Sequence, residues 1–204
     1  MSERFLDKVY NARNADETRG IYDAWSASYE AELSQNGYVT PARCAEALAL
    51  KQTDKALPVL DFGCGTGLSG LALKLAGFDV LDGIDLSAEM LAKAAEKGIY
   101  RSLRQIEPDA PLGFEPGTYA SIAAIGVIGS GAAPVGTLDT LMEALNPGGL
   151  CVFSFNDHTL EDPSYEARVS EWTDCGAARL LVREHGDHVP GIGLKATVYI
   201  LEKT

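Results

Sequence analysis

The sequence has few of the features that identify metal-binding, secreted or membrane proteins. It contains three histidines and four cysteines in 204 residues, and no two cysteines form a C-x-x-C pair, so we expect free thiols and no bound metal. No apolar run is long enough to span a bilayer, and the first residues lack the apolar stretch of a signal peptide. These absences predict a cytoplasmic protein that does not enter the membrane.

Basic residues are also scarce. The chain has 17 lysines and arginines against 29 aspartates and glutamates, which gives a formal net charge of -12. Nucleic acids and anionic lipid surfaces are bound by clustered lysine and arginine, so neither is an expected partner. An acidic surface would instead suit a basic protein. The sequence does not indicate an oligomeric state.

The remaining composition is that of a folded protein, since 46% of the residues are hydrophobic. The length favours a single domain over 1–204. Apolar residues at helical spacing predict a helical segment over 1–55, and the pattern then changes to alternating strands and helices over 56–204. Such alternation is typical of an α/β protein with a parallel sheet.

Short apolar runs give the positions of the strands. Two consecutive strands at the end of the chain, joined by a linker at 186–193, predict an antiparallel edge on the sheet. The predicted strands are 57–62, 79–84, 100–105, 119–128, 150–155, 179–184 and 195–202. The predicted helices of this region are 68–76, 88–97, 135–145 and 163–175.

A glycine-rich turn connects the first strand to the helix that follows it. It reads Asp-Phe-Gly-Cys-Gly-Thr-Gly over residues 61–67. Small residues at such a turn let a ligand lie against the backbone, and the start of the helix offers unpaired N–H groups. The turn therefore predicts a site for a nucleotide-like ligand.

Spacing and charge distinguish the possible ligands. A dinucleotide fingerprint would place a third glycine at position 68, which is Leu68 here. Asp61 precedes the first glycine, where its charge would oppose a pyrophosphate and suit a cation such as S-adenosylmethionine. Asp85 follows the second strand, 20 residues after Gly65, where a carboxylate that binds ribose is expected. Asp85 fits NAD equally well, so Asp61 and the glycine spacing decide between the two cofactors.

These residues resemble the class I S-adenosylmethionine-dependent methyltransferases. The blocks that carry the resemblance are 60–67, 83–91, 112–128 and 145–150, together with 22–29, which looks like the helix that lies across the cofactor. Segments 98–101 and 186–203 are similar to the branch called methyltransferase-like protein 27. The resemblance implies a Rossmann-like domain with a mostly parallel seven-stranded sheet, an antiparallel C-terminal strand, helices on both faces and an N-terminal helical cap.

The resemblance also implies roles for particular residues. Asp61 would bind the ammonium group of the cofactor and Asp85 its ribose hydroxyls. The glycines would lie behind the methionine part, and four side chains would surround the adenine: Leu86, Met90, Ile106 and Glu107. The complete predicted cofactor site is Tyr22, Trp25, Tyr29, Asp61, Phe62, Gly63, Cys64, Gly65, Gly67, Asp85, Leu86, Met90, Ile106, Glu107 and Ile125.

Several of these residues also have a structural interpretation. The aromatic residues of 22–29 have the spacing of a core stripe, and Cys64 is better suited to packing than to catalysis. Pro108 stands where relatives often have leucine and offers no N–H to the adenine.

The acceptor half of the site departs further from the family. Ala120 and Ala132 replace the aspartate and histidine of many relatives, so a ready general base is missing there. His158 and His188 are the remaining candidates for a base. Residues 156–158 either contact the substrate or cap the turn after their strand.

We therefore expect methyl transfer to a small-molecule acceptor. A protein that binds the cofactor without catalysis, a protein methyltransferase and, with less support, an NAD-dependent oxidoreductase remain alternatives.

Overall fold

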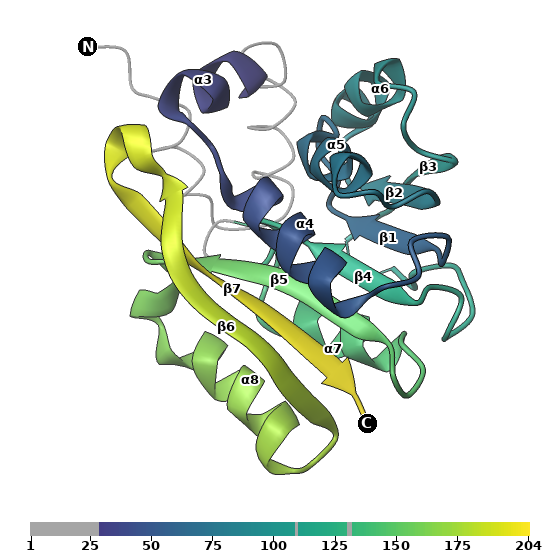
Figure 1. Cartoon of the computed structure of the whole chain (residues 1–204), viewed down its shortest axis with the longest axis vertical. Helices are drawn as coiled ribbons and strands as arrows, with labels where there is room; N and C mark the ends of the chain where they lie inside the picture. The colour runs from purple at the N-terminus through teal and green to yellow at the C-terminus, as the bar shows by residue number, and fades with distance from the viewer. Residues whose placement is uncertain (1–28, 109, 130–131) are drawn as a thin grey trace.

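The computed structural model describes residues 29–108, 110–129 and 132–204, and these form a sheet flanked by helices (Figure 1). The strands are β1 Val59–Phe62, β2 Leu81–Asp85, β3 Ser102–Gln105, β4 Ser121–Ala124, β5 Leu150–Asn156, β6 Ala178–Val189 and β7 Leu194–Lys203. The helices are α3 Tyr29–Asn36, α4 Thr40–Lys51, α5 Leu68–Leu75, α6 Ala88–Glu96, α7 Thr137–Glu143 and α8 Pro163–Asp174, with short 3-10 turns η1 Thr159–Glu161 and η2 Pro190–Ile192.

The seven strands form one sheet in the order β3-β2-β1-β4-β5-β7-β6. β1 to β5 are parallel where they pair, and β7 runs antiparallel to both β5 and β6. The predicted α/β fold, with its mostly parallel sheet and antiparallel C-terminal strand, is confirmed. The strand order reverses direction beside β1, so the carboxyl ends of β1, β2 and β4 lie at the point where such sheets bind ligands.

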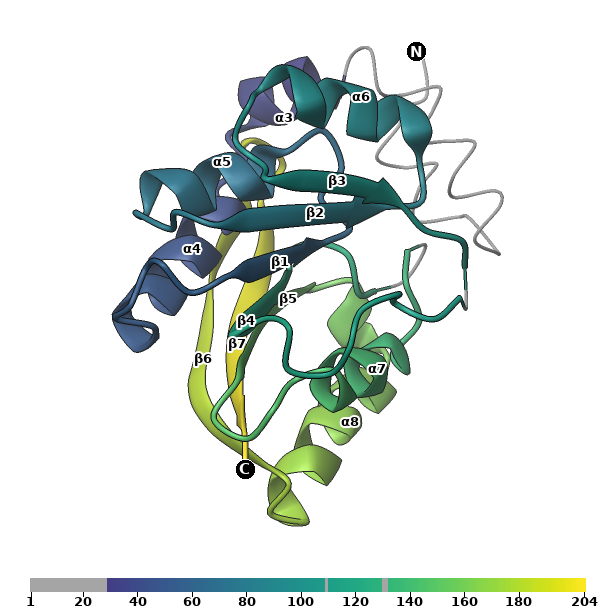
Figure 2. The ribbon, with the colours of Figure 1, turned by 90° about the vertical axis from the view of Figure 1, so that its right-hand side faces the viewer.

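The sheet is covered on both faces, as predicted. Figure 2 shows α4 and α5 on one side of it and α7 and α8 on the other. Successive residues of a strand point to opposite faces. In β1, Val59 belongs to the apolar cluster under α4 and α5, whereas Leu60 belongs to the cluster under α7 and α8. Asp61 is next in this alternation and therefore faces α5.

The helices begin at residues suited to that position. Ser87 precedes α6 and its hydroxyl accepts a hydrogen bond from the Met90 N–H, and Asp162 caps α8 through the Ser164 N–H in the same way. Pro41 lies in the first turn of α4, where its missing N–H costs nothing.

The structure corrects two element boundaries. The strand expected at 119–128 ends at Ala124 and is followed by turns. The expected linker at 186–193 is mostly strand, because β6 continues to Val189 and leaves only a short turn before β7. The glycine at position 186 suggested a loop, but Gly186 pairs with Ala196 inside the sheet.

Two further expectations concern the first part of the chain. The described portion of the predicted helical cap consists of α3 and α4, while residues 1–28 lie outside the described residues. In the part of the chain that the structure describes, no helix has the length and apolar character needed to cross a membrane.

Candidate functional site

The glycine-rich turn leaves β1 and enters α5 at the carboxyl edge of the sheet. Gly63, Gly65 and Gly67 all have positive φ angles, of 68°, 53° and 91°, which other residues rarely adopt. A Cβ atom on Gly63 would lie 2.5 Å from a methyl group of Val127, so this position also lacks room for a side chain. A Cβ atom on Gly65 would meet nothing within 4 Å, so the backbone at Gly65 has open space beside it.

Asp85 ends β2 beside this turn. Its carboxylate accepts a hydrogen bond from the Gly65 N–H at 2.8 Å and another from the Ser87 N–H at 2.9 Å. The backbone of the turn is also bound to β2, since Gly63 N and Cys64 N donate to the Ile84 carbonyl. The structure therefore brings together the two strongest signals of the sequence, the turn and Asp85.

Asp61 is fully buried beneath the turn. Its Oδ2 accepts hydrogen bonds from the hydroxyls of Ser69 and Tyr100, both at 2.7 Å, whereas its Oδ1 has no hydrogen-bond partner among the described residues. Burial raises the pKa of Asp61 to about 6, although the hydrogen bonds from Tyr100 and Ser69 oppose this shift. A buried carboxylate oxygen without a donor is costly, so it suits a ligand that brings one.

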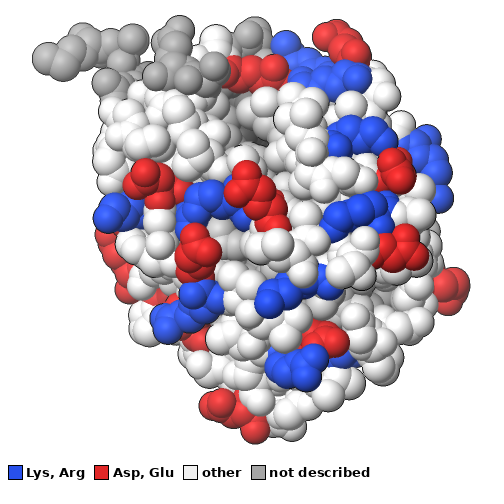
Figure 3. Space-filling view, viewed as in Figure 1, with Lys and Arg blue, Asp and Glu red and all other residues white. Residues whose placement is uncertain are grey.

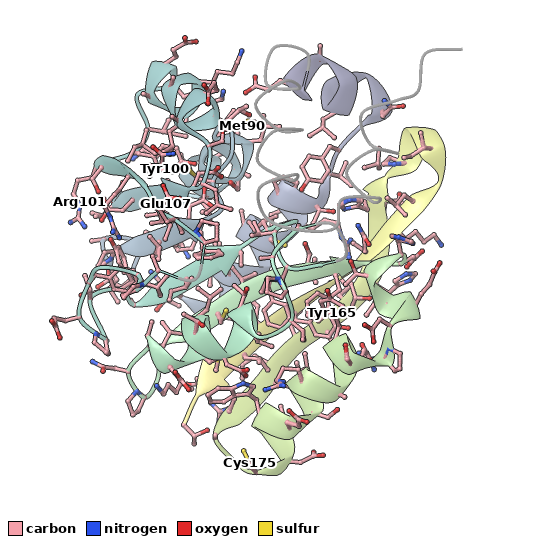
Figure 4. The ribbon with its side chains drawn as sticks, turned by 180° about the vertical axis from the view of Figure 1, so that it is seen from behind. Met90, Tyr100, Arg101, Glu107, Tyr165 and Cys175 are labelled. Atoms are coloured by element: carbon pink, nitrogen blue, oxygen red, sulfur yellow. The ribbon has the colours of Figure 1, made fainter. Side chains whose placement is uncertain are left out.

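The residues predicted around the adenine lie at the ends of β2 and β3. Ile106 N donates to the Asp85 carbonyl at 3.0 Å, which joins these two strand ends. Leu86 and Ile106 are half-buried and Glu107 is exposed, but Met90, in the first turn of α6, is buried. Figure 4 shows Met90 and Glu107 in the part of the molecule formed by α6, β2 and β3, far from Cys175.

The side chains of several other predicted cofactor residues pack in the protein interior. Phe62 packs against the cluster under α7 and α8, and Ile125 belongs to the cluster under α4 and α5. Cys64 is buried, and burial raises the pKa of its thiol, so it is not a nucleophile. Tyr22 and Trp25 lie outside the described residues, and Tyr29 is the first residue of α3.

His188 occupies a β-bulge in β6. The pairing shifts between Asp187 and Val189, and the His188 side chain is buried against α4, with Nδ1 2.8 Å from the Thr40 hydroxyl. Burial, followed by the charge of Arg43, lowers the pKa of His188 to about 4. His188 is therefore a neutral, oriented imidazole at neutral pH.

Tyr38 connects His188 to the end of β4. Its ring packs edge-on against His188 with the centroids 5.2 Å apart, and a Cβ atom on Gly126 would lie 2.7 Å from its hydroxyl oxygen. Val39 N also donates to the His188 carbonyl. The link between α3 and α4 is thus attached to β6 and reaches the carboxyl end of β4.

The polar residues after β5 have structural partners. Asn156 Oδ1 accepts from Thr159 N and so caps the turn that follows the strand, and Asp157 Oδ1 lies 2.8 Å from His185 Nε2. His158 lies 3.5 Å from Glu161. Of the two interpretations of 156–158, the structure shows the cap for Asn156, and the role of His158 as a base stays a prediction.

Sequence reasoning missed Tyr100, Tyr38 and Arg43. Tyr100 was expected only to begin a strand, yet it reaches the buried Asp61 across 39 positions of sequence. Arg43 donates to the carbonyls of Glu184, Asp187 and Ala196 and so fixes the β6–β7 hairpin on α4. The glycines beside Tyr100 and Arg43 indicate in the sequence that another group approaches closely, but they do not identify which side chain it is.

Charges on the face formed by α4, β6 and β7 alternate in sign. Figure 3 shows lysines and arginines interleaved with acidic residues there, and ion pairs such as Arg43–Glu184 and Arg179–Glu202 account for part of this pattern. The net negative charge therefore does not produce a uniform acidic patch on this face.

Comparisons with known proteins agree with this geometry. Residues 37–194 match the methyltransferase domain family. Methyltransferase-like protein 27 from Homo sapiens is 31% identical over 133 residues, which are 64% of this chain and 54% of that protein. The chain thus spans about half the length of this curated relative, and the predicted resemblance to its branch is confirmed.

Solved structures show the same fold. A chain in the complex between the Haloferax volcanii Trm112 methyltransferase activator and a methyltransferase superposes with a TM-score of 0.66 at 18% identity, covering 92% of this chain and 98% of that one. A SAM-dependent methyltransferase from Thiobacillus denitrificans in complex with S-adenosyl-L-homocysteine gives a TM-score of 0.57 at 16% identity, covering 79% and 91%. Since the family match includes β1 to β6 and the whole glycine-rich turn, the chain belongs to the methyltransferase domain family.

Proposed function

We propose that the protein transfers a methyl group from S-adenosylmethionine to a small-molecule acceptor. The observation that carries the proposal is the pair of carboxylates at the glycine-rich turn. Asp85 is fixed beside open backbone at Gly65, and Asp61 keeps one buried oxygen to which none of the described residues donates. Two carboxylates at one turn suit a ligand that has hydroxyls and a positive charge, and do not suit a pyrophosphate.

The residues present fit this cofactor. Asp61 Oδ1 would accept a hydrogen bond from the ammonium group, and Asp85 would accept hydrogen bonds from the ribose hydroxyls. The backbone at Gly65 would lie against the methionine part. Leu86 and Ile106, both half-buried, would contact the adenine. When bound, S-adenosylmethionine supplies an activated methyl carbon, so the protein mainly has to orient the acceptor and exclude water.

The acceptor would bind at the carboxyl end of β4, beside Gly126. Tyr38 reaches this position from the α3–α4 link, and its ring rests on the buried His188. With its pKa lowered to about 4, His188 would orient the acceptor side through Tyr38 more readily than it would remove a proton. Because the α3–α4 link and the β6–β7 hairpin adjoin this end of β4, the arrangement favours a small acceptor over a folded protein.

Calorimetric titration with S-adenosylmethionine and with NADH tests the cofactor. We expect binding of the former and none of the latter, and tight binding of NADH alone would overturn the proposal. The acceptor requires a second experiment, in which the protein is incubated with methyl-labelled S-adenosylmethionine and a pool of small metabolites. Label should enter a small molecule, and an Asp85→Ala variant should abolish its transfer.

The same experiment separates the alternatives. Label that enters protein in a lysate, and no small molecule, would support a protein methyltransferase. Cofactor binding without transfer to either pool would indicate a binding protein that does not catalyse methylation.

A further inference from the structure

Tyr100 lies between α6 and β3, and its ring occupies space that three glycines leave open. A Cβ atom on Gly70 would lie 2.1 Å from the Tyr100 hydroxyl oxygen, and a Cβ atom on Gly83 would lie 3.1 Å from its ring. At Gly67 the corresponding distance is 3.3 Å. Figure 4 shows Tyr100 inside the part of the molecule formed by α6, β2 and β3, whereas the neighbouring Arg101 points outward.

Two of these glycines have no backbone reason to be glycine. Gly70 is inside α5 and Gly83 is inside β2, and neither has a positive φ angle. Glycine destabilises the interior of a helix or a strand relative to alanine. Gly70 therefore sacrifices local stability to admit the Tyr100 side chain, whereas at Gly83 the side chains of Leu103 and Cys64 come closer than the Tyr100 ring. At the far end of the ring, the Tyr100 hydroxyl donates to Asp61.

Among the described residues, no positive charge is paired with that of Asp61. Ser69 faces it from α5 and Tyr100 from the α6–β3 loop, while Asp85 and the thiol of Cys64 are the neighbouring ionisable groups on the ligand side. In the described part of the chain, no lysine, arginine or histidine forms an ion pair with Asp61. The side-chain donors to this carboxylate are the hydroxyls of Ser69 and Tyr100, and the backbone of Gly70 also stabilises its charge.

We propose that Tyr100 is a positioning residue of the cofactor site, which holds Asp61 through Oδ2 so that Oδ1 is presented to the ammonium group of the ligand. This inference rests on the proposed function, because it assumes that S-adenosylmethionine binds at the glycine-rich turn. Since two donors occupy Oδ2, the carboxylate has one orientation and one available oxygen. Loss of the Tyr100 hydroxyl frees Asp61 to rotate and makes its ionised form less stable.

The test compares Tyr100→Phe with Tyr119→Phe. Each variant loses a tyrosine hydroxyl that donates to a buried aspartate, at 2.7 Å to Asp61 and at 2.9 Å to Asp82. Binding is measured by calorimetry with S-adenosylmethionine and with 5′-methylthioadenosine, which lacks the ammonium group. We expect Tyr100→Phe to weaken S-adenosylmethionine binding roughly 10-fold at pH 7 and to leave 5′-methylthioadenosine binding unchanged. Tyr119→Phe should change neither.

The pH profile gives a readout that a purely structural role would not move. A cationic ligand needs ionised Asp61, so the affinity of the wild type should fall as the pH drops through about 6. Removal of the Tyr100 hydrogen bond raises this pKa further, so the midpoint should move toward neutral pH in Tyr100→Phe. For 5′-methylthioadenosine, neither protein should show this midpoint.

The outcomes separate the inference from the proposed function. A wild type that binds neither ligand would contradict the cofactor site itself. Normal S-adenosylmethionine binding by Tyr100→Phe, with an unchanged pH midpoint, would contradict only the role of Tyr100. If Tyr100→Phe does not fold by circular dichroism, Gly70→Ala serves as the second variant, because its methyl group displaces the hydroxyl from Asp61 and should produce the same selective loss.

Discussion

Two buried aspartates in adjacent parallel strands have opposite surroundings. Asp82 near the start of β2 accepts hydrogen bonds from Arg101, Ser102 and Tyr119. Burial alone would raise the pKa of Asp82, but these hydrogen bonds hold it below its usual range. Asp61 in β1 has two hydroxyl donors and forms no ion pair with a described residue, and burial raises its pKa to about 6.

The difference is the one expected between a structural carboxylate and the ligand-binding carboxylate that we propose Asp61 to be. Arg101 supplies the charge that Asp82 needs, so Asp82 is complete without any other molecule. Asp61 has an oxygen without a hydrogen-bond partner among the described residues and lies near the carboxyl edge of the sheet, so under our proposal the compensating charge comes from the ligand. A buried carboxylate with an incomplete set of donors lowers the stability of the unliganded protein, a cost that binding sites commonly carry.

Asp61→Asn should have the largest effect on binding, because it removes the negative charge that we propose to bind the ammonium group of the ligand. We expect S-adenosylmethionine to bind roughly 100-fold more weakly at pH 7, while 5′-methylthioadenosine binds as before. Calorimetry with both ligands measures this. Equal weakening of the two ligands would show that the variant has distorted the turn.

The same variant, which weakens binding, should remove a loss of stability that the unliganded wild type shows as the pH rises. Folded Asp61 keeps its proton up to about pH 6, whereas the ordinary pKa of the unfolded chain is 3.8. The unfolding free energy of the wild type therefore gains a contribution that is lost as the pH rises between these values. Urea unfolding of Asp61→Asn should lack this decline.

Asp82→Asn should lower the unfolding free energy by about 2 kcal/mol and leave cofactor affinity unchanged. The substitution removes the charge that Arg101 compensates and places an amide N–H beside the guanidinium. Urea unfolding at pH 7 measures the loss of stability. A large decrease in S-adenosylmethionine affinity in the folded variant would contradict the division between the two aspartates.

The smallest effects should come from the two serines that donate to these carboxylates, each at 2.7 Å. Ser69→Ala should weaken S-adenosylmethionine binding about 3-fold, because Oδ2 of Asp61 keeps the Tyr100 hydroxyl. Ser102→Ala should leave binding unchanged and cost about 0.5 kcal/mol of stability, because Arg101 and Tyr119 remain on Asp82. Equal S-adenosylmethionine affinity in the two variants would contradict the proposed difference between Asp61 and Asp82.

The parts of the molecule that were predicted from the sequence depend on local patterns. The turn and Asp85 are 20 residues apart and are joined by one strand–helix–strand unit, so their proximity follows from the alternation of apolar runs. Strand positions and the antiparallel end of the sheet were predicted in the same way.

The parts that were missed depend on contacts between distant segments. Gly186 suggested a loop by composition, yet it pairs with Ala196 in β6, and the Arg43 side chain occupies the space that a Cβ atom would need. Tyr100 was expected to begin a strand, and nothing local shows that its ring fits beside Gly70 and Gly83. Glycines inside regular elements indicated close approach, but only the fold shows what approaches.

The two regions of the proposed site differ in how far apart in sequence their contacting residues lie, and the position of β7 explains the difference. β7 follows β6 in the chain but lies between β5 and β6, so within the described residues β6 obtains its sheet hydrogen bonds from β7 alone. The contact between Thr40 and His188 spans 148 residues, whereas Gly65 and Asp85 are 20 apart. Closing the longer loop costs more chain entropy, so the proposed cofactor site is encoded in a short local unit, whereas the proposed acceptor site depends on the completed sheet.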